Sequence, residues 1–259
     1  MTENKRYHFI TGLPRSGSTM LSSILLQNPR FHASVTDPVA TFVKGMIDTL
    51  GNEPGMKSEV PVHRRINTIR GMFDGYYQQV DKPVIFNTNR GWTYLVPTMH
   101  QVYPDARYIV CVRDINWVLN SLETAHRANP LTTNTVTGGP GDSVYDRVEN
   151  LMGEKNFVGF PYVGIKQAIT SAEKHLLMLV EYDQLCAQPG AVIKAVYNFI
   201  DEPHYEHDFD DVERDWKQYD EEIGIELHNI RPRIEPIKRT MLLPPDIVQK
   251  YQGAEVWRL

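Results

Sequence analysis

The feature that most limits the possible folds of this chain is the segment GLPRSGST at residues 12–19. It follows a short apolar run from Tyr7 to Thr11 and precedes residues of helical composition that extend to Leu26. A strand, a glycine-bounded loop and a helix in this order and spacing are typical of a phosphate-binding P-loop, G-x-x-x-x-G-K-[ST]. Glycine permits the tight turn, and the loop amides and the helix N-terminus point at an anion. The segment therefore predicts an anion site at the end of the first strand.

The loop departs from the P-loop pattern at one position, because Ser18 stands where the lysine is expected. That lysine reaches the β and γ phosphates in P-loop nucleotidases, so its absence argues against an ATPase and leaves anion binding intact. Ser16, Ser18 and Thr19 supply hydroxyl donors, and Arg15 supplies a permanent positive charge with forked donors. A plain Gly/Ser turn before a helix is the alternative interpretation.

Apolar strand candidates alternate with helical segments along the first 200 residues. The strand candidates are 7–11, 84–86, 107–112 and 176–180. The helical candidates are 19–26, 39–50, 64–80, 94–102, 117–127, 144–152, 162–175 and 191–200. This alternation predicts an α/β fold, a central parallel sheet flanked by helices on both faces. We find no internal repeat and no linker, and therefore expect a single domain over residues 1–259.

Composition and charge argue against several classes of protein. The net charge is −5, whereas nucleic-acid binders usually carry a basic excess. The two cysteines, Cys111 and Cys186, form no metal-binding spacing, so no metal is expected. Cys111 lies in an apolar run and is expected to pack as a small hydrophobe. No apolar run reaches about 18 residues and no signal-like segment precedes the first strand, which predicts a cytoplasmic protein without a membrane partner.

The residues FITGLPRSGST at 9–19 resemble the 5′-phosphosulfate loop of the sulfotransferases that use 3′-phosphoadenosine-5′-phosphosulfate (PAPS). This version of the loop is similar to that of the bacterial and tyrosylprotein branches of the family. The resemblance implies a P-loop-like PAPS-binding fold and transfer of a sulfonate group from PAPS to a hydroxyl or amine of a small-molecule or peptide acceptor. Adenosine 3′,5′-bisphosphate (PAP) would be released. The loop residues implied to hold the nucleotide are Pro14, Arg15, Ser16, Gly17, Ser18 and Thr19.

Two further segments resemble parts of the family that contact PAPS. The family holds the 3′-phosphate with an arginine at a strand end and a serine eight residues later, and Arg113 and Ser121 match this pattern. The segment LVEYDQL at 179–185 resembles one whose tyrosine, here Tyr182, lines the adenine and ribose side of the site. Taken alone, Arg113 would equally well pair with a neighbouring acid, and Tyr182 would be an ordinary strand-end residue.

A basic segment near the C-terminus is a third candidate part of the nucleotide site. We expect Lys238 and Arg239 to reach the nucleotide from this segment. The alternative is a solvated basic face that balances the acidic stretch 206–222.

The base that takes the proton of the acceptor is the least determined part of the predicted site. Where cytosolic members carry Lys-Thr-His, this chain reads NTN at 87–89, which contains no good base at neutral pH. Asp37 falls within one residue of the position of the glutamate base of the tyrosylprotein branch, and is the first candidate. Its alternative role is to cap the helix that begins near Pro38. His228 is the second candidate, and Arg15 is expected to stabilise developing charge.

Two other functions fit parts of the pattern. A P-loop kinase of a small molecule would explain the loop and the sheet, but it requires a lysine at position 18 and a strand-end aspartate for magnesium. A non-catalytic nucleotide-binding relative would explain the absent lysine and histidine at 87–89.

The acceptor pocket is expected to be shaped by a loop at 51–61 and an irregular stretch at 128–162, because variable loops on a rigid sheet carry specificity. The aromatic residues that would line it, or pack in the core instead, are Trp92, Tyr94, Tyr145, Phe157, Phe160 and Tyr162.

Overall fold

The computed structural model describes residues 5–128, 133–138, 141–212, 214, 220–221, 227–228, 231–235 and 239–258. A central sheet of five parallel strands runs in the order β2-β3-β1-β4-β5. Its strands are β1 (Arg6–Gly12), β2 (Phe31–Ala33), β3 (Val84–Thr88), β4 (Tyr108–Val112) and β5 (Leu177–Glu181). The predicted α/β fold with a parallel sheet flanked by helices is confirmed.

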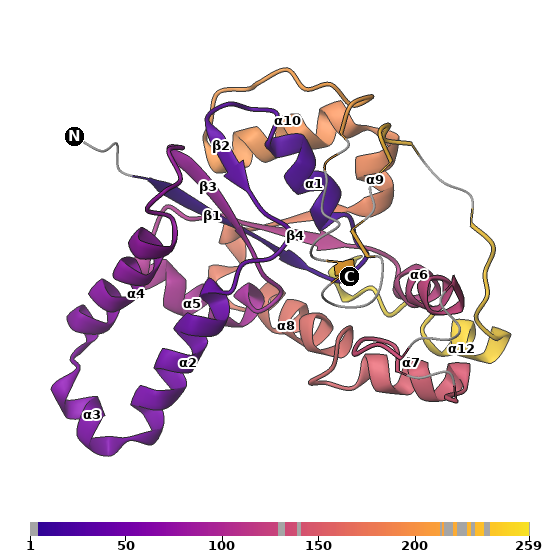
Figure 1. Ribbon diagram of the computed structural model, residues 1–259, viewed down its shortest axis with the longest axis horizontal. Coiled ribbons are helices and arrows are strands. Elements are labelled where there is room, and N and C mark those ends of the chain that lie inside the picture. Colours follow the sequence, from indigo (N-terminus) through magenta and orange to yellow (C-terminus); the bar gives the residue numbers. More distant parts are fainter. Residues whose placement is uncertain are drawn as a thin grey trace.

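Helices surround this sheet in the described part of the chain (Figure 1). They are α1 (Ser18–Leu25), α2 (Val39–Asn52), α3 (Pro54–Glu59), α4 (Val62–Tyr76), α5 (Trp92–Val102), α6 (Ile115–Ala128), α7 (Val144–Met152), α8 (Gly159–Ile169), α9 (Tyr182–Ala187), α10 (Pro189–Ile200) and α12 (Pro245–Lys250). Two 3-10 turns are η1 (Ala172–Leu176) and η2 (Val256–Arg258). Among the described residues, no helix is long and apolar enough to cross a membrane.

Each strand side chain packs on one of two cores, because successive residues of a strand point to opposite faces. Phe9, Tyr108 and Val110 pack with α2, α4, α5 and α6 on one face. Ile10 and Ile109 pack with α1, α9 and α10 on the other. Burial of one such large side chain stabilises the fold by about 1.5–3 kcal/mol.

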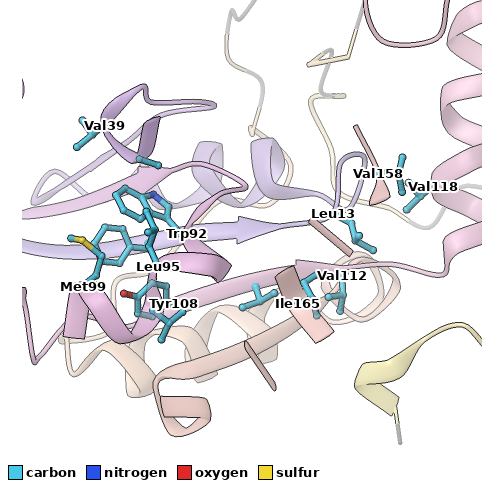
Figure 2. Packing of buried hydrophobic residues seen from close by; sticks show 14 of the residues in the cluster. Leu13, Val39, Trp92, Leu95, Met99, Tyr108, Val112, Val118, Val158 and Ile165 are labelled. Atoms are coloured by element: carbon cyan, nitrogen blue, oxygen red, sulfur yellow. The ribbon is translucent and has the colours of Figure 1, made fainter. Parts of the chain in front are cut away.

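Figure 2 shows part of the first core, where side chains of α5 gather beside the strands. The indole of Trp92 lies 4.5 Å from the ring of Phe9, measured between centroids, and Tyr108 stacks on Phe9 at 4.9 Å. Cys111 belongs to the second core and is fully buried, as its apolar surroundings predict. Both faces of the central strands are thus covered, which explains their nearly continuous apolar sequences.

Two differences between the structure and the sequence prediction concern the strands and the predicted loop at 51–61. Strand β2 was not predicted, because three residues are too few to display an alternating pattern; it forms by pairing with β3, with Phe31 opposite Val84. The segment 51–61 is not a loop, because α2 continues to Asn52 and Pro54 opens α3. Proline is tolerated in the first turn of a helix, where its missing N–H has no partner to lose.

The parallel register brings the carboxyl ends of the strands to one edge of the sheet. Gly12 lies opposite Cys111, and Val112 lies opposite Glu181. Ligands of open α/β sheets collect at this edge, so the loops that follow β1, β3, β4 and β5 form the candidate site.

Candidate active site

The loop between β1 and α1 is held in a conformation that its glycines require. Gly12 has φ +122°, and a Cβ there would lie 2.0 Å from the carbonyl oxygen of Cys111 on β4. Gly17 has φ +91°, and a Cβ there would lie 2.9 Å from the ring of Tyr182. Arg15 also has positive φ, at 58°, which is uncommon for a residue with a side chain. The loop therefore curls tightly over the strand ends and leads directly into the N-terminus of α1.

Ser16 holds this loop from the inside. Its fully buried hydroxyl lies 2.5 Å from the carbonyl oxygen of Leu13 and 2.9 Å from that of Cys111. The Ser16 side chain thus ties the loop to β4. Its predicted contact with the nucleotide stays a prediction, which its backbone amide could fulfil.

Three arginines from distant parts of the chain meet around Ser121 of α6. The Nε of Arg15 donates to Ser121 Oγ at 3.1 Å, and Nη1 of Arg239 donates to the same oxygen at 3.3 Å. Nη1 of Arg113 donates to the backbone oxygen of Arg15 at 3.2 Å. A serine hydroxyl has two lone pairs and one proton, so these two bonds leave Ser121 its proton to donate to a ligand.

This arginine cluster is electrostatically unfavourable without an anion. Burial and the neighbouring Arg239 and Arg113 lower the pKa of Arg15 to about 10. Burial also lowers the pKa of Arg113, and Arg239 lowers it further. Neighbouring like charges destabilise one another, and a negatively charged ligand would relieve the repulsion among the three arginines.

Arg113 has one hydrogen-bonding group with no partner. Its guanidinium lies over the ring of Tyr182, 4.1 Å from the ring centroid. Its Nε–H is buried and has no hydrogen-bond partner among the described residues. A buried donor without a partner costs about 1–3 kcal/mol, which a bound anion would recover.

The cluster forms the wall of a cavity that we call the basic cavity. Its lining residues are Pro14, Arg15, Gly17, Ser18, Thr19, Met20, Arg90, Arg113, Tyr182, Cys186, Leu227, His228, Arg231, Arg233, Ile234, Glu235 and Arg239. Most of the residues predicted to bind the nucleotide are therefore brought together here. Lys238 lies outside the described residues.

A second cavity, which we call the polar cavity, adjoins the first and has a volume of about 480 Å³. Ser18, Arg90 and His228 line both cavities. The remaining lining residues are Ile10, Thr11, Gly12, Leu13, Val35, Thr36, Thr88, Asn89, Thr135, Val136, Asn150, Leu151, Lys155, Asn156, Phe157, Phe160 and Pro161. The stretch 128–162 contributes much of this wall, and 51–61 contributes nothing to it. That 128–162 shapes the acceptor pocket stays a prediction.

Only part of the predicted aromatic lining faces the polar cavity. Phe157 and Phe160 line it, and the guanidinium of Arg90 lies 4.0 Å from the centroid of Phe157. Trp92 is a fully buried core residue, and Tyr145 is an exposed residue of α7. Tyr94 stacks behind Phe160 at 4.6 Å, and the Tyr162 hydroxyl donates to the backbone of Ala254.

The walls of the polar cavity are braced by a buried ion pair between α6 and α7. Glu123 of α6 accepts from Nε and Nη2 of Arg147, at 2.9 and 2.7 Å. Nε of Arg127 donates to the same carboxylate at 2.7 Å. The pair fixes α7, which carries Asn150 and Leu151 into the cavity wall.

His228 is held at the junction of the cavities by an aspartate that sequence reasoning missed. Its Nδ1 lies 2.5 Å from Oδ1 of Asp220, and both side chains are largely buried. Burial lowers the pKa of His228, Asp220 opposes this shift, and Arg15 and Arg90 add to it. Asp220 gave no sequence signal, because it stands in the acidic stretch 206–222 that resembles a solvated face.

Asp37 lies beneath the site and does not line either cavity. Its carboxylate accepts from the hydroxyls of Ser34 and Tyr76 and from the backbone N–H of Thr88. The predicted helix-capping role is wrong, because Pro38 occupies the N-cap of α2 and no side chain caps it. Instead Asp37 ties the loop before α2 to the end of β3. Its assignment as the base stays a prediction.

Comparison with known proteins confirms the family that the motifs predict. The model of the Sulfotransferase family matches residues 8–207. The nodulation protein NoeE of Sinorhizobium fredii (strain NBRC 101917 / NGR234) is 24% identical over 216 residues, covering 73% of this chain and 48% of that protein. The chain thus spans about half the length of this relative.

Solved structures of low sequence identity share the fold. The sulfotransferase domain from the Synechococcus PCC 7002 olefin synthase has a TM-score of 0.55 at 17% identity, over 99% of this chain and 96% of that one. Retinol dehydratase in complex with retinol and PAP has a TM-score of 0.53 at 13% identity, over 97% and 80%. Since the family model matches well over half of its residues, the chain belongs to the sulfotransferase family.

Proposed function

We propose that this protein transfers the sulfonate group of PAPS to an acceptor hydroxyl or amine and releases PAP. The observation that carries the proposal is the sharing of Ser18, Arg90 and His228 between the basic cavity and the polar cavity. A donor in the first and an acceptor in the second would meet at these three side chains. Structural relatives with bound PAP support the choice of donor.

The residues of the basic cavity fit a nucleotide with two phosphorylated positions. The orphaned Nε–H of Arg113 and the remaining proton of Ser121 suit the 3′-phosphate. The loop amides, Arg15 and Thr19 suit the 5′-phosphosulfate, since they surround the N-terminus of α1. Tyr182 offers a ring beside them for the nucleoside.

When bound, PAPS supplies an activated sulfonate whose leaving group is a phosphate. His228 takes the proton from the acceptor. Because a carboxylate can only accept, the Asp220 contact assigns the ring proton to Nδ1, so that the basic lone pair of the imidazole is on Nε2. The lowered pKa of His228 keeps the imidazole neutral near pH 7, as a base requires. Arg15, Arg90 and Ser18 donate toward charge that develops where the cavities meet.

The proposal is tested by binding and then by turnover. PAP should raise the melting temperature more than ATP with Mg²⁺, because PAP carries the 3′-phosphate that we assign to Arg113 and Ser121. Radiolabelled PAPS should then yield a labelled product with a mixed panel of hydroxyl and amine acceptors. A larger shift from ATP with Mg²⁺ would favour the small-molecule kinase. A PAP shift without turnover of any acceptor would favour a non-catalytic relative.

A further inference from the structure

The charges that line the polar cavity are of one sign. Arg90 and Lys155 line it, and no aspartate or glutamate among the described residues does so. His228 is the remaining titratable residue of the lining, and burial lowers its pKa toward the neutral form. A cationic acceptor would therefore enter a positive cavity without a partner, whereas an anionic one would be attracted.

The two cations differ in which cavities they line. Arg90 lines both the basic cavity and the polar cavity. Lys155 lines the polar cavity alone, is exposed and has no ion-pair partner among the described residues. Lys155 is thus the cation of the polar cavity that does not also line the basic cavity.

The lining of the polar cavity also contains neutral polar groups, which could hydrogen-bond to the hydroxyls of an acceptor. The Oγ1 of Thr88 is buried and has no hydrogen-bond partner among the described residues, although Thr88 lines the cavity. Buried polar groups are usually hydrogen-bonded, so this hydroxyl marks an unsatisfied polar position next to the cavity. The side chains of Thr11, Thr36 and Asn156 also line the cavity, and Phe157 and Phe160 give it an apolar wall.

From this arrangement we infer that the acceptor is a hydroxyl compound that carries a carboxylate or a phosphate, and not an amine. Lys155 binds the anionic group, and the hydroxyl lies at His228. The acceptor O–H bond breaks and its proton passes to Nε2 of His228. The acceptor oxygen bonds to the sulfur of the sulfonate, and the bond between that sulfur and the 5′-phosphate oxygen breaks. This inference rests on the proposed function, which it narrows.

Two matched sets of compounds test the inference by binding to the protein saturated with PAP, measured by calorimetry. The saccharide set is glucuronate, glucose 6-phosphate, glucose and glucosamine. The phenol set is 4-hydroxyphenylacetate, its amide and tyramine. We expect the anionic member of at least one set to bind about 1.4-fold to fivefold more tightly than its neutral counterpart, the range of an exposed ion pair, and the amines to bind most weakly. Comparing glucuronate with glucose 6-phosphate distinguishes carboxylate from phosphate.

Variants at one position assign the effect to Lys155. Lys155→Gln should lower the ratio of kcat/KM for anionic over neutral acceptors by about 1.4-fold to fivefold, and Lys155→Glu should lower it further. Lys174→Gln removes an exposed lysine outside the polar cavity and should leave the ratio unchanged. Equal or tighter binding of the neutral or amine members, no binding of any anionic member, or an unchanged ratio in Lys155→Glu would overturn the inference. Failure of PAP itself to bind would instead overturn the proposed function.

Discussion

One carboxylate fixes both the ring and the backbone of His228. Oδ1 of Asp220 lies 2.5 Å from Nδ1 of the imidazole, while Oδ2 accepts the backbone N–H groups of Leu227 at 3.1 Å and of His228 at 2.9 Å. The imidazole cannot turn without losing a short hydrogen bond. Its second nitrogen is therefore held in a defined direction at the junction of the two cavities.

His228→Ala should lower kcat by about 10² to 10⁴, the usual contribution of a general base, with the affinity for PAP nearly unchanged. Asp220→Asn should cause a smaller loss, since the ring remains but its orientation and tautomer are less well defined. Steady-state kinetics and PAP calorimetry measure both effects. Glu221→Gln is the matched control, because this substitution removes one negative charge from an exposed neighbour of Asp220. Full activity of His228→Ala would show that another group takes the proton.

The pH dependence of kcat/KM should report the imidazole. Because the pKa of His228 is lowered, activity should stay constant around neutral pH and fall on the acid side, with a midpoint below the usual value of about 6.5. The contact with Asp220 raises the pKa, so Asp220→Asn should move this acid limb to still lower pH. A purely structural role for Asp220 predicts no movement of the limb.

Stability should decrease in acid through a second histidine, His8, which is buried in β1. Burial, Arg6 and Arg107 lower the pKa of His8 to about 3. The unfolded chain binds a proton at about pH 6.5 and the folded chain does not, so the free energy of unfolding should fall as the pH is lowered from 6.5 toward 3. His8→Gln should flatten this part of the curve in urea titrations at several pH values. An equally steep curve in the variant would assign the acid sensitivity to other groups.

Arg113→Ala should weaken PAP by about 1.5–3 kcal/mol, the value of a charge-assisted hydrogen bond, and should weaken adenosine 5′-phosphate little. The reason is the orphaned Nε–H of Arg113, which we assign to the 3′-phosphate. Calorimetry with both nucleotides separates the two phosphate sites. Arg64→Ala, on the exposed surface of α4, is the control for loss of positive charge. Equal weakening of both nucleotides would mean that Arg113 faces the 5′-phosphate.

Asp37→Asn distinguishes the two roles open to Asp37. As the base, Asp37 would make this variant nearly inactive at an unchanged melting temperature. As a structural residue, it would make the variant less stable by about 1–3 kcal/mol with near-normal turnover, because a carboxylate that accepts from Ser34, Tyr76 and Thr88 is impaired. The hydrogen bonds favour the second outcome. Thermal denaturation and kinetics on the same sample decide between them.

Glu123→Gln should destabilise the protein by about 3–5 kcal/mol, because the partly buried Arg147 would lose its charged partner. Denaturant titration measures this loss. Glu149→Gln, an exposed change on the same helix, should be within about 0.5 kcal/mol of wild type. A small effect of Glu123→Gln would show that α7 is held by its apolar contacts alone.

Part of the lining of the basic cavity could be found in the sequence, because its signals are local. The loop at 12–19 and Arg113 each follow a buried strand directly, so their placement follows from the parallel sheet. The proposed base was one of two candidates in the sequence. Asp220 and His228 lie eight residues apart with no sequence pattern that links them, and the acidic residues around Asp220 conceal its role. Asp37 lies within one residue of the position of the glutamate base of the tyrosylprotein branch. Its carboxylate accepts a hydrogen bond from Tyr76, a partner that no local pattern indicates.

The site is assembled from two stretches of chain with different relations to the family. The region matched by the family model ends at residue 207, and it contains Arg15 and Arg113 but not Asp220, His228 or Arg239. Under the proposed function, the shared region would hold the donor, and the group that removes the proton would come from the segment that follows it. A chimaera that joins residues up to 207 of one relative to the following segment of another should show the donor preference of the first and the pH optimum of the second.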